Sequence, residues 1–282
     1  MNSLRIESFG SVCQINADNR LLDEIRSDKF TKHFIPGANF VDSEPNVTLS
    51  RRDMDKPVQI EYPTGHFKDG LSSRDIVTVA EYLLERSRQS NGIYSLSSSS
   101  ASKNSNSVIF WGGATNLGKT SSMIKIVDDY GFEFISDEKT VVSLENHRVI
   151  GGSESIPVRK RVIGGLVKGE LGQFHQPTQR VRGSTNLSLM IQPHIDDGRK
   201  EPIFYLLNSD DFYWHLTREL SQSIRGTTRL VDGFNYQLAS IDTEELSKKR
   251  NSDTRLLCRN VPCFYFQGSL DQISEFVNSK LQ

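Results

Sequence analysis

The chain has 282 residues, which is enough for one large domain or two smaller ones. Its formal net charge is −1, so the composition does not support a bulk nucleic-acid binder or a protein held to an anionic membrane surface. Three scattered cysteines are too few for a disulfide framework and suit a reducing compartment, so we expect a cytoplasmic protein. No apolar run approaches the length of about 18 residues that a membrane-spanning helix needs.

Residues 1–92 are predicted to form a small α+β module. Apolar and polar side chains alternate in Leu4–Phe9 and in Val58–Tyr62, as they do in half-buried strands. Apolar residues at helical spacing predict a helix that begins near Ser72 or Ser73. Eight serines then fall between residues 95 and 107. This composition favours a flexible connector or an exposed hairpin, although Ile93–Leu96 could form a strand.

Residues 93–282 are predicted to form an α/β domain. We expect strands at Ser107–Trp111, Gly131–Ile135, Val141–Leu144, Arg148–Ile150 and Pro262–Phe266, and helices at Ser121–Tyr130 and Leu270–Leu281. The continuous apolar run Pro202–Leu207 predicts a central strand. The segment Ser209–Asp211 after it could bind a metal ion, but Ser and Asp are also preferred helix caps, and we favour the cap.

The segment Gly113–Thr120 fits the pattern G-x-x-x-x-G-K-[ST], a loop that wraps the phosphates of a nucleotide. A predicted strand precedes it and a predicted helix follows it. In that arrangement the backbone N–H groups at the start of the helix converge on one point, and the helix dipole favours an anion there. The alternative is a chance match, which the flanking strand and helix make less plausible.

Each position of this loop has a physical role. Gly113 and Gly118 let the backbone turn and approach the phosphates closely. Lys119 would reach the β- and γ-phosphates, and the Thr120 hydroxyl would bind Mg²⁺. Asn116 stands where many such loops carry another glycine, and asparagine tolerates a positive φ better than most residues.

A phosphate loop does not handle the acceptor, so a second group is needed. The segment Ser136–Glu138 follows the strand that comes next after the loop and its helix. This return path would bring Asp137 to face the γ-phosphate, with Asp137 and Glu138 pointing to opposite sides of an extended chain. One carboxylate could then take the acceptor proton while the other supports the metal ion. The alternative is a solvated acidic turn.

The run Phe110–Ser121, the following helix, Gly131 and the segment Phe134–Glu138 resemble the bacterial HPr kinase family. The chain is also similar to that family's wider relatives, which share their nucleotide fold with ATP-type phosphoenolpyruvate carboxykinase. The resemblance covers about residues 93–282. It implies an α/β fold with a P-loop kinase core like that of phosphoenolpyruvate carboxykinase, preceded by the small N-terminal module.

By this resemblance, Lys119 and Asp137 would be the catalytic residues, with Asp137 as the base toward an acceptor hydroxyl. Thr120 and Glu138 would hold Mg²⁺. Family members often carry a histidine on the strand before the loop, and this chain has Ser97 there. The implied ATP-binding residues are Gly113, Ala114, Thr115, Asn116, Leu117, Gly118, Lys119, Thr120 and Ser121.

Together these features predict an ATP- and Mg²⁺-dependent kinase that transfers the γ-phosphoryl group to a hydroxyl of a protein, a peptide or a small molecule. Two alternatives stay open: a switch that hydrolyses its nucleotide, and a module that binds ATP without chemistry. Family members often assemble as oligomers, so the resemblance allows a homo-oligomer. We expect no nucleic-acid or membrane partner.

Overall fold

The computed structural model describes residues 2–112, 116–157, 161–163, 166–168, 174–175, 177, 179–181, 183–226, 230–231 and 236–281. The chain divides into two compact units, and each unit is built from separate segments of sequence. Unit 1 contains Met1–Leu96, Val141–His147 and Asn208–Asn260. Unit 2 contains Ser97–Thr140, Arg148–Leu207 and Val261–Gln282. The predicted N-terminal module therefore shares unit 1 with two later segments.

Unit 1 contains a mixed sheet of six strands. They are β1 (Asn2–Ser8), β2 (Ser11–Ala17), β3 (Asn39–Phe40), β4 (Val47–Arg51), β5 (Val58–Glu61) and β6 (Thr64–Phe67). Their order is β3-β1-β2-β4-β6-β5, in which β2 and β4 and also β4 and β6 are parallel while the other neighbours are antiparallel. The other strands of unit 1 are β7 (Ile93–Leu96), β11 (Thr140–Ser143), β19 (Leu230–Val231) and β20 (Tyr236–Gln237).

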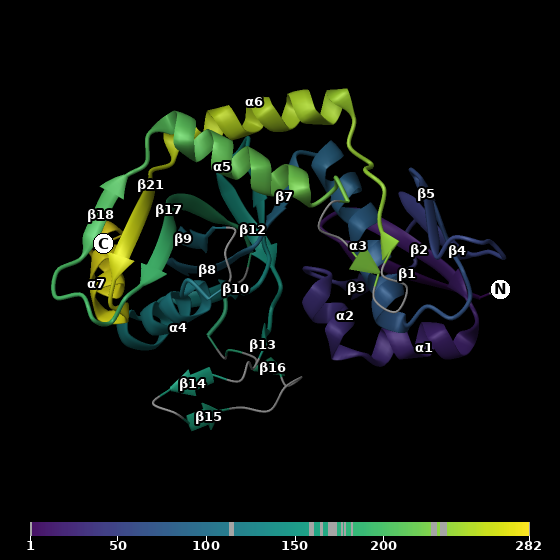
Figure 1. Ribbon diagram of the computed structural model, residues 1–282, viewed down its shortest axis with the longest axis horizontal. Coiled ribbons are helices and arrows are strands. Elements are labelled where there is room, and N and C mark those ends of the chain that lie inside the picture. The colour runs from purple at the N-terminus through teal and green to yellow at the C-terminus, as the bar shows by residue number, and fades with distance from the viewer. Residues whose placement is uncertain are drawn as a thin grey trace. The chain divides into compact units, whose positions relative to one another are not determined.

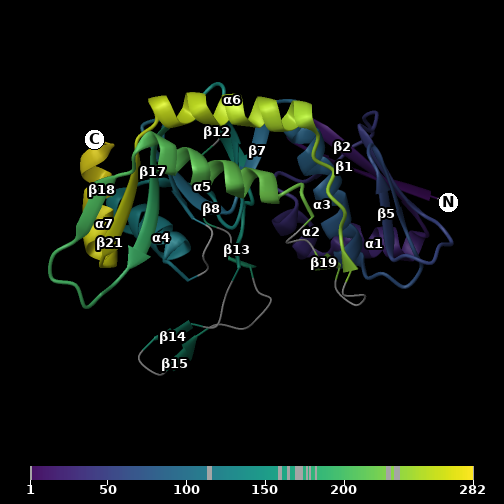
Figure 2. The ribbon, with the colours of Figure 1, turned by 45° about the horizontal axis from the view of Figure 1, so that its top comes forward.

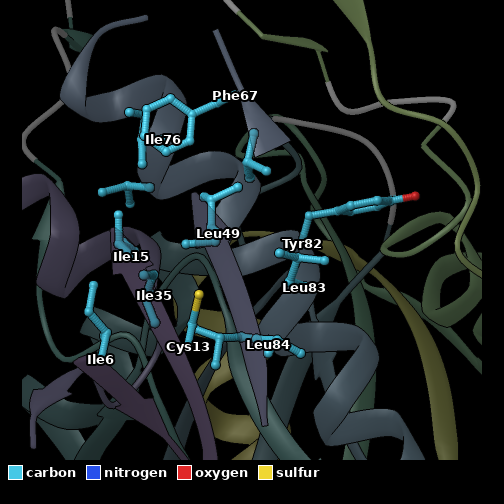
Figure 3. Packing of buried hydrophobic residues seen from close by; sticks show 14 of the residues in the cluster. Ile6, Cys13, Ile15, Ile35, Leu49, Phe67, Ile76, Tyr82, Leu83 and Leu84 are labelled. Carbon is cyan, nitrogen blue, oxygen red and sulfur yellow. The ribbon is translucent and has the colours of Figure 1, made fainter. Parts of the chain in front are cut away.

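Helix α3 (Ser73–Ser90) packs on this sheet together with α1 (Asn19–Ser27) and α2 (Lys29–Phe34), and these elements enclose an apolar core. The other helices of unit 1 are α5 (Ser209–Gln222) and α6 (Glu244–Asn260), which pack against each other. Figure 3 shows side chains of the sheet, such as Ile15 and Leu49, packed against Ile76 and Leu83 of α3. Burial of this apolar surface is the main stabilising contribution to the unit.

The N-terminal ends of helices α3 and α5 can be compared with the predicted helix start near Ser72 and the predicted cap within Ser209–Asp211. Helix α3 begins after Ser72, whose side chain accepts a hydrogen bond from the Asp75 N–H in a reciprocal capping box, so the predicted start is confirmed. Helix α5 begins at Ser209, and its N-cap is Asn208, whose side chain accepts from the N–H groups of Asp210 and Asp211. The prediction of a cap within Ser209–Asp211 was therefore wrong by one residue, because asparagine caps a helix as well as serine or aspartate does.

Helix α3 also carries a buried ion cluster. Arg88 donates to Glu81 and Glu85 at 2.8 and 2.7 Å, and all three side chains are almost inaccessible. Burial by itself lowers the pKa of Arg88, but the charges of the two glutamates raise it above its ordinary value. Burial also raises the pKa of Glu85, but the Arg88 charge and hydrogen bonds from Gln89, Arg88 and Ser95 outweigh it and hold that pKa below its usual range.

We expect the substitution Arg88→Met to destabilise the protein by about 3–5 kcal/mol, because it leaves two buried carboxylates without their cation. Urea unfolding measures this loss. Arg20→Met is the control, since Arg20 is 90% exposed in its pair with Glu24 and such pairs contribute about 0–1 kcal/mol. Because the folded-state pKa of Glu85 is lowered, its contribution is present above its unfolded pKa and is lost as the pH falls through the folded one. Equal losses in the two variants would contradict this account.

Unit 2 is built on a second mixed sheet. Its strands are β8 (Ser98–Lys103), β9 (Asn106–Trp111), β10 (Glu133–Ser136), β12 (Arg148–Gly152), β17 (Thr185–Ile195), β18 (Ile203–Leu206) and β21 (Cys263–Gly268). The order across the unit is β10-β8-β9-β17-β21-β18, and β12 pairs with the start of β17. Strands β9, β17 and β21 are parallel, and β8, β10 and β18 run antiparallel to their neighbours. Shorter pairs are β13 (Ile156–Pro157) with β16 (Phe174–His175), and β14 (Arg161–Ile163) with β15 (Leu166–Lys168).

Two helices pack on this sheet and against each other, α4 (Lys119–Tyr130) and α7 (Leu270–Lys280) (Figure 1). Their apolar faces bury Met123, Ile126, Ile273 and Val277 with side chains of the central strands. The predicted helices and the strands on either side of them are thus confirmed. Both units combine a mixed sheet with helices, as the predicted α/β class requires.

The serine-rich stretch is not a connector. Ser98–Lys103 forms strand β8, which pairs with β9 and β10, and its residues Ser98 to Ser100 are buried. The serine composition was misleading because their hydroxyl groups are satisfied inside the sheet, for example between Ser100 and Ser136 at 2.6 Å.

The predicted central strand Pro202–Leu207 is also corrected. Strand β18 lies at the edge of the sheet and pairs, within the described part of the chain, with β21 (Figure 2). Its four residues Ile203, Phe204, Tyr205 and Leu206 are 43–59% exposed. An apolar run alone does not tell a central strand from an edge strand.

No helix in the described ranges is both long and apolar enough to cross a membrane.

Candidate phosphate-binding site

The predicted phosphate loop, Gly113–Thr120, connects β9, which lies between β8 and β17 in the sheet of unit 2, to α4. Gly113, Ala114 and Thr115 lie outside the described residues. Asn116 has a φ of +64°, a left-handed conformation that asparagine tolerates better than most residues. Gly118 has a φ of +96° and is the N-cap of the helix.

The start of α4 is suited to an anion. Its N-cap is a glycine, which has no side chain to cap the helix, and the first turn (Lys119, Thr120 and Ser121) contains no acidic residue. Backbone N–H groups at such a helix start need an acceptor from elsewhere. The end of β17 holds the loop in place, because the Ile195 N–H donates to the Leu117 carbonyl at 3.2 Å. This hydrogen bond connects Leu117, next to the start of α4, to the adjacent parallel strand.

Gly118 is required here for two reasons. Its φ lies in the region that residues with a side chain rarely adopt, and a Cβ atom at this position would lie 2.1 Å from Cγ1 of Ile195. The backbone of the loop thus approaches β17 more closely than any other residue type allows.

We expect Gly118→Ala to lower the free energy of unfolding by about 1–3 kcal/mol, through backbone strain and the collision with Ile195, and to weaken nucleotide binding. Chemical denaturation and calorimetry with ATP measure the two effects. Gly131→Ala is the matched control, because Gly131 ends the same helix with a φ of +69° but has open space around its Cβ position. A loss no larger than in the control would show that the contact with Ile195 is unimportant.

Lys119 lies in the first turn of α4 with a half-buried side chain. Its ammonium group donates to the Gly112 carbonyl at 2.8 Å. The side chain thus reaches back to the residue that follows β9. A lysine is a flexible point charge, so it can exchange this carbonyl for a phosphate oxygen.

Asp137 follows directly after β10 and reaches the phosphate loop. The Thr120 hydroxyl donates to Oδ1 of Asp137 at 2.8 Å, and the Ser99 hydroxyl donates to the same oxygen. The backbone is held as well, because the Asp137 N–H donates to the Ser153 carbonyl at 3.1 Å. The Asp137 side chain is only 1% exposed. The structure therefore brings together the loop threonine and the carboxylate that the sequence separates by 17 positions.

Glu138 occupies a tight turn beside Asp137. It has a φ of +68°, and its carbonyl accepts a hydrogen bond from the Ser98 N–H at 3.2 Å. A left-handed conformation is costly for a residue with a side chain and is maintained only where the surroundings fix it. Gly152 provides part of that support, since a Cβ atom there would lie 2.2 Å from the Lys139 carbonyl. The Glu138 side chain is half-buried.

Sequence reasoning missed Ser99 and Ser153. Ser97, which stands where the resemblance places a histidine, is exposed, whereas Ser99 two residues later contacts Asp137. Ser99 pairs with Phe110 across the β8–β9 hairpin, but the composition had favoured a flexible connector or an exposed hairpin, in which Ser99 would not be buried. Ser153 accepts the hydrogen bond from Asp137 with its backbone carbonyl, so its side-chain type could not have indicated this contact.

The residues at this site fit Mg²⁺ in the chemistry of their donors. Hydroxyl and carboxylate oxygens are the hard ligands that Mg²⁺ prefers, and this ion is usually held by one or two protein groups together with substrate phosphates. No group of three or more His, Cys, Asp or Glu residues that could hold a metal ion occurs among the described residues.

No protein-family model matches the chain, and no curated protein matches it either. The interpretation of the site therefore depends on its residues and their geometry.

Proposed function

We propose that the protein is an ATP- and Mg²⁺-dependent kinase that transfers the γ-phosphoryl group to a hydroxyl acceptor. The observation that carries this proposal is the hydrogen bond from Thr120 to Asp137, which joins the phosphate loop to an acidic strand end. A lone loop motif supports only phosphate binding. A buried carboxylate next to the loop threonine adds what phosphoryl transfer requires, a group near the metal ion and the reacting phosphate.

In this proposal the loop and the start of α4 bind the phosphates through backbone N–H groups. Lys119 neutralises charge on the phosphoryl group as it transfers. Thr120 and Glu138 would hold Mg²⁺, which would supply positive charge to the phosphates when bound. Asp137 orients the acceptor hydroxyl and takes its proton. The resemblance to the HPr kinase family supports the same division of roles.

The acceptor class is a hydroxyl of a protein, a peptide or a small molecule. A transfer screen tests it: the protein is incubated with labelled ATP, Mg²⁺ and pools of small alcohols, free amino acids and serine-containing peptides. A labelled acceptor in at least one pool is the expected result. Release of free phosphate in every pool would favour a nucleotide-hydrolysing switch instead. ATP binding without any turnover would favour a non-catalytic ATP-binding protein.

A further inference from the structure

A chain of three side chains crosses the base of the site. It begins at Ser99 on β8, passes through Asp137 at the end of β10, and ends at Thr120 on α4. The hydroxyls of Ser99 and Thr120 both donate to the same carboxylate oxygen, Oδ1. Ser99 is 1% exposed and belongs to a strand that is paired on both sides, so its position is fixed by the sheet.

Each of these hydroxyl groups has a single proton, and in both groups that proton is donated to Asp137. A threonine hydroxyl has one proton and two acceptor lone pairs. Because the Thr120 proton is directed to Asp137, the lone pairs of its oxygen remain for a cation. The direction of the Thr120 hydroxyl therefore depends on where the Asp137 carboxylate is held. Ser99 is the side chain from the sheet that holds the same oxygen.

We propose that Ser99 is a positioning residue for metal binding: it fixes the Asp137 carboxylate and, through it, orients the Thr120 hydroxyl toward Mg²⁺. The inference rests on the proposed function. It assigns to Ser99 an effect on the metal ion that is exerted through two other side chains and without contact to the nucleotide. The affinity of the protein for ATP in the absence of metal should then be independent of Ser99.

Calorimetric titration with ATP, in EDTA and in excess Mg²⁺, tests this. For the wild type we expect Mg²⁺ to strengthen ATP binding. Ser99→Ala should reduce that gain about tenfold, the least that one hydrogen bond to a charged group contributes, and leave binding in EDTA unchanged. Ser99→Cys should act in the same direction, because a thiol keeps the volume but donates weakly. Ser99→Cys also provides the test if the Ser99→Ala variant does not fold.

Ser102→Ala is the matched control, since Ser102 lies on the same strand, is equally buried, and donates to the Asn106 carbonyl. It should retain the full gain from Mg²⁺. A gain that survives in Ser99→Ala, or that falls equally in Ser102→Ala, would overturn the positioning role and leave the proposed function intact. A wild type that binds no ATP in either buffer would instead overturn the proposed function and this inference with it.

Discussion

Lys119→Ala is expected to lower the rate of phosphoryl transfer by roughly a thousandfold, the effect of removing one charged donor from a developing anion in a water-poor site. ATP affinity should fall as well, because the same ammonium group attracts the phosphates in the ground state. The measurement is single-turnover transfer from labelled ATP to the acceptor identified in the screen, together with calorimetric binding of ATP.

Lys125→Ala is the control for this variant. Lys125 lies on the same helix but pairs with Asp129 and Asp271 on the surface. Its removal should leave transfer unchanged, which separates the loss of the loop cation from a general effect on α4. Full activity in Lys119→Ala would show that the loop does not bind a reacting phosphate.

Asp137→Asn is expected to separate binding from chemistry. The amide oxygen of asparagine can accept the hydrogen bonds from Thr120 and Ser99, so the shape of the site is kept while its charge is lost. We expect ATP binding to remain within a few-fold and transfer to fall by roughly 10²–10⁴-fold, the usual contribution of a general base. Calorimetry and single-turnover transfer measure the two quantities.

The control for the second variant is Asp128→Asn, on the exposed surface of α4. It removes the same charge from the same unit and should leave both quantities unchanged. If Asp137→Asn transferred phosphate at the wild-type rate, Asp137 would not be the base. Loss of ATP binding together with transfer would assign Asp137 to the metal ion alone.

Most elements of unit 2 were predictable because their signals are local. The strand before the loop, helix α4 and helix α7 all follow from apolar spacing, whereas Gly131, which was predicted to begin the next strand, instead ends α4. The two wrong predictions in this unit, at β8 and β18, both concern how far the side chains of a strand are buried. Serine in β8 is buried because partners across the sheet satisfy its hydroxyls, and apolar β18 is exposed because it lies at an edge. Burial depends on neighbours that are distant in sequence.

The sequence by itself determined that a segment with glycine joins a strand to a helix here, since such a segment needs only a contiguous run with glycine where the backbone is left-handed, as at Gly118. It also placed an acidic pair one helix and one strand later. Only the tertiary structure decided that Asp137 meets Thr120 and that Ser99 binds the same oxygen. These contacts join two strands, β8 and β10, and one helix, α4, near their ends. Their geometry is set by strand order and by the packing of α4 on the sheet, which a linear pattern of residues does not contain.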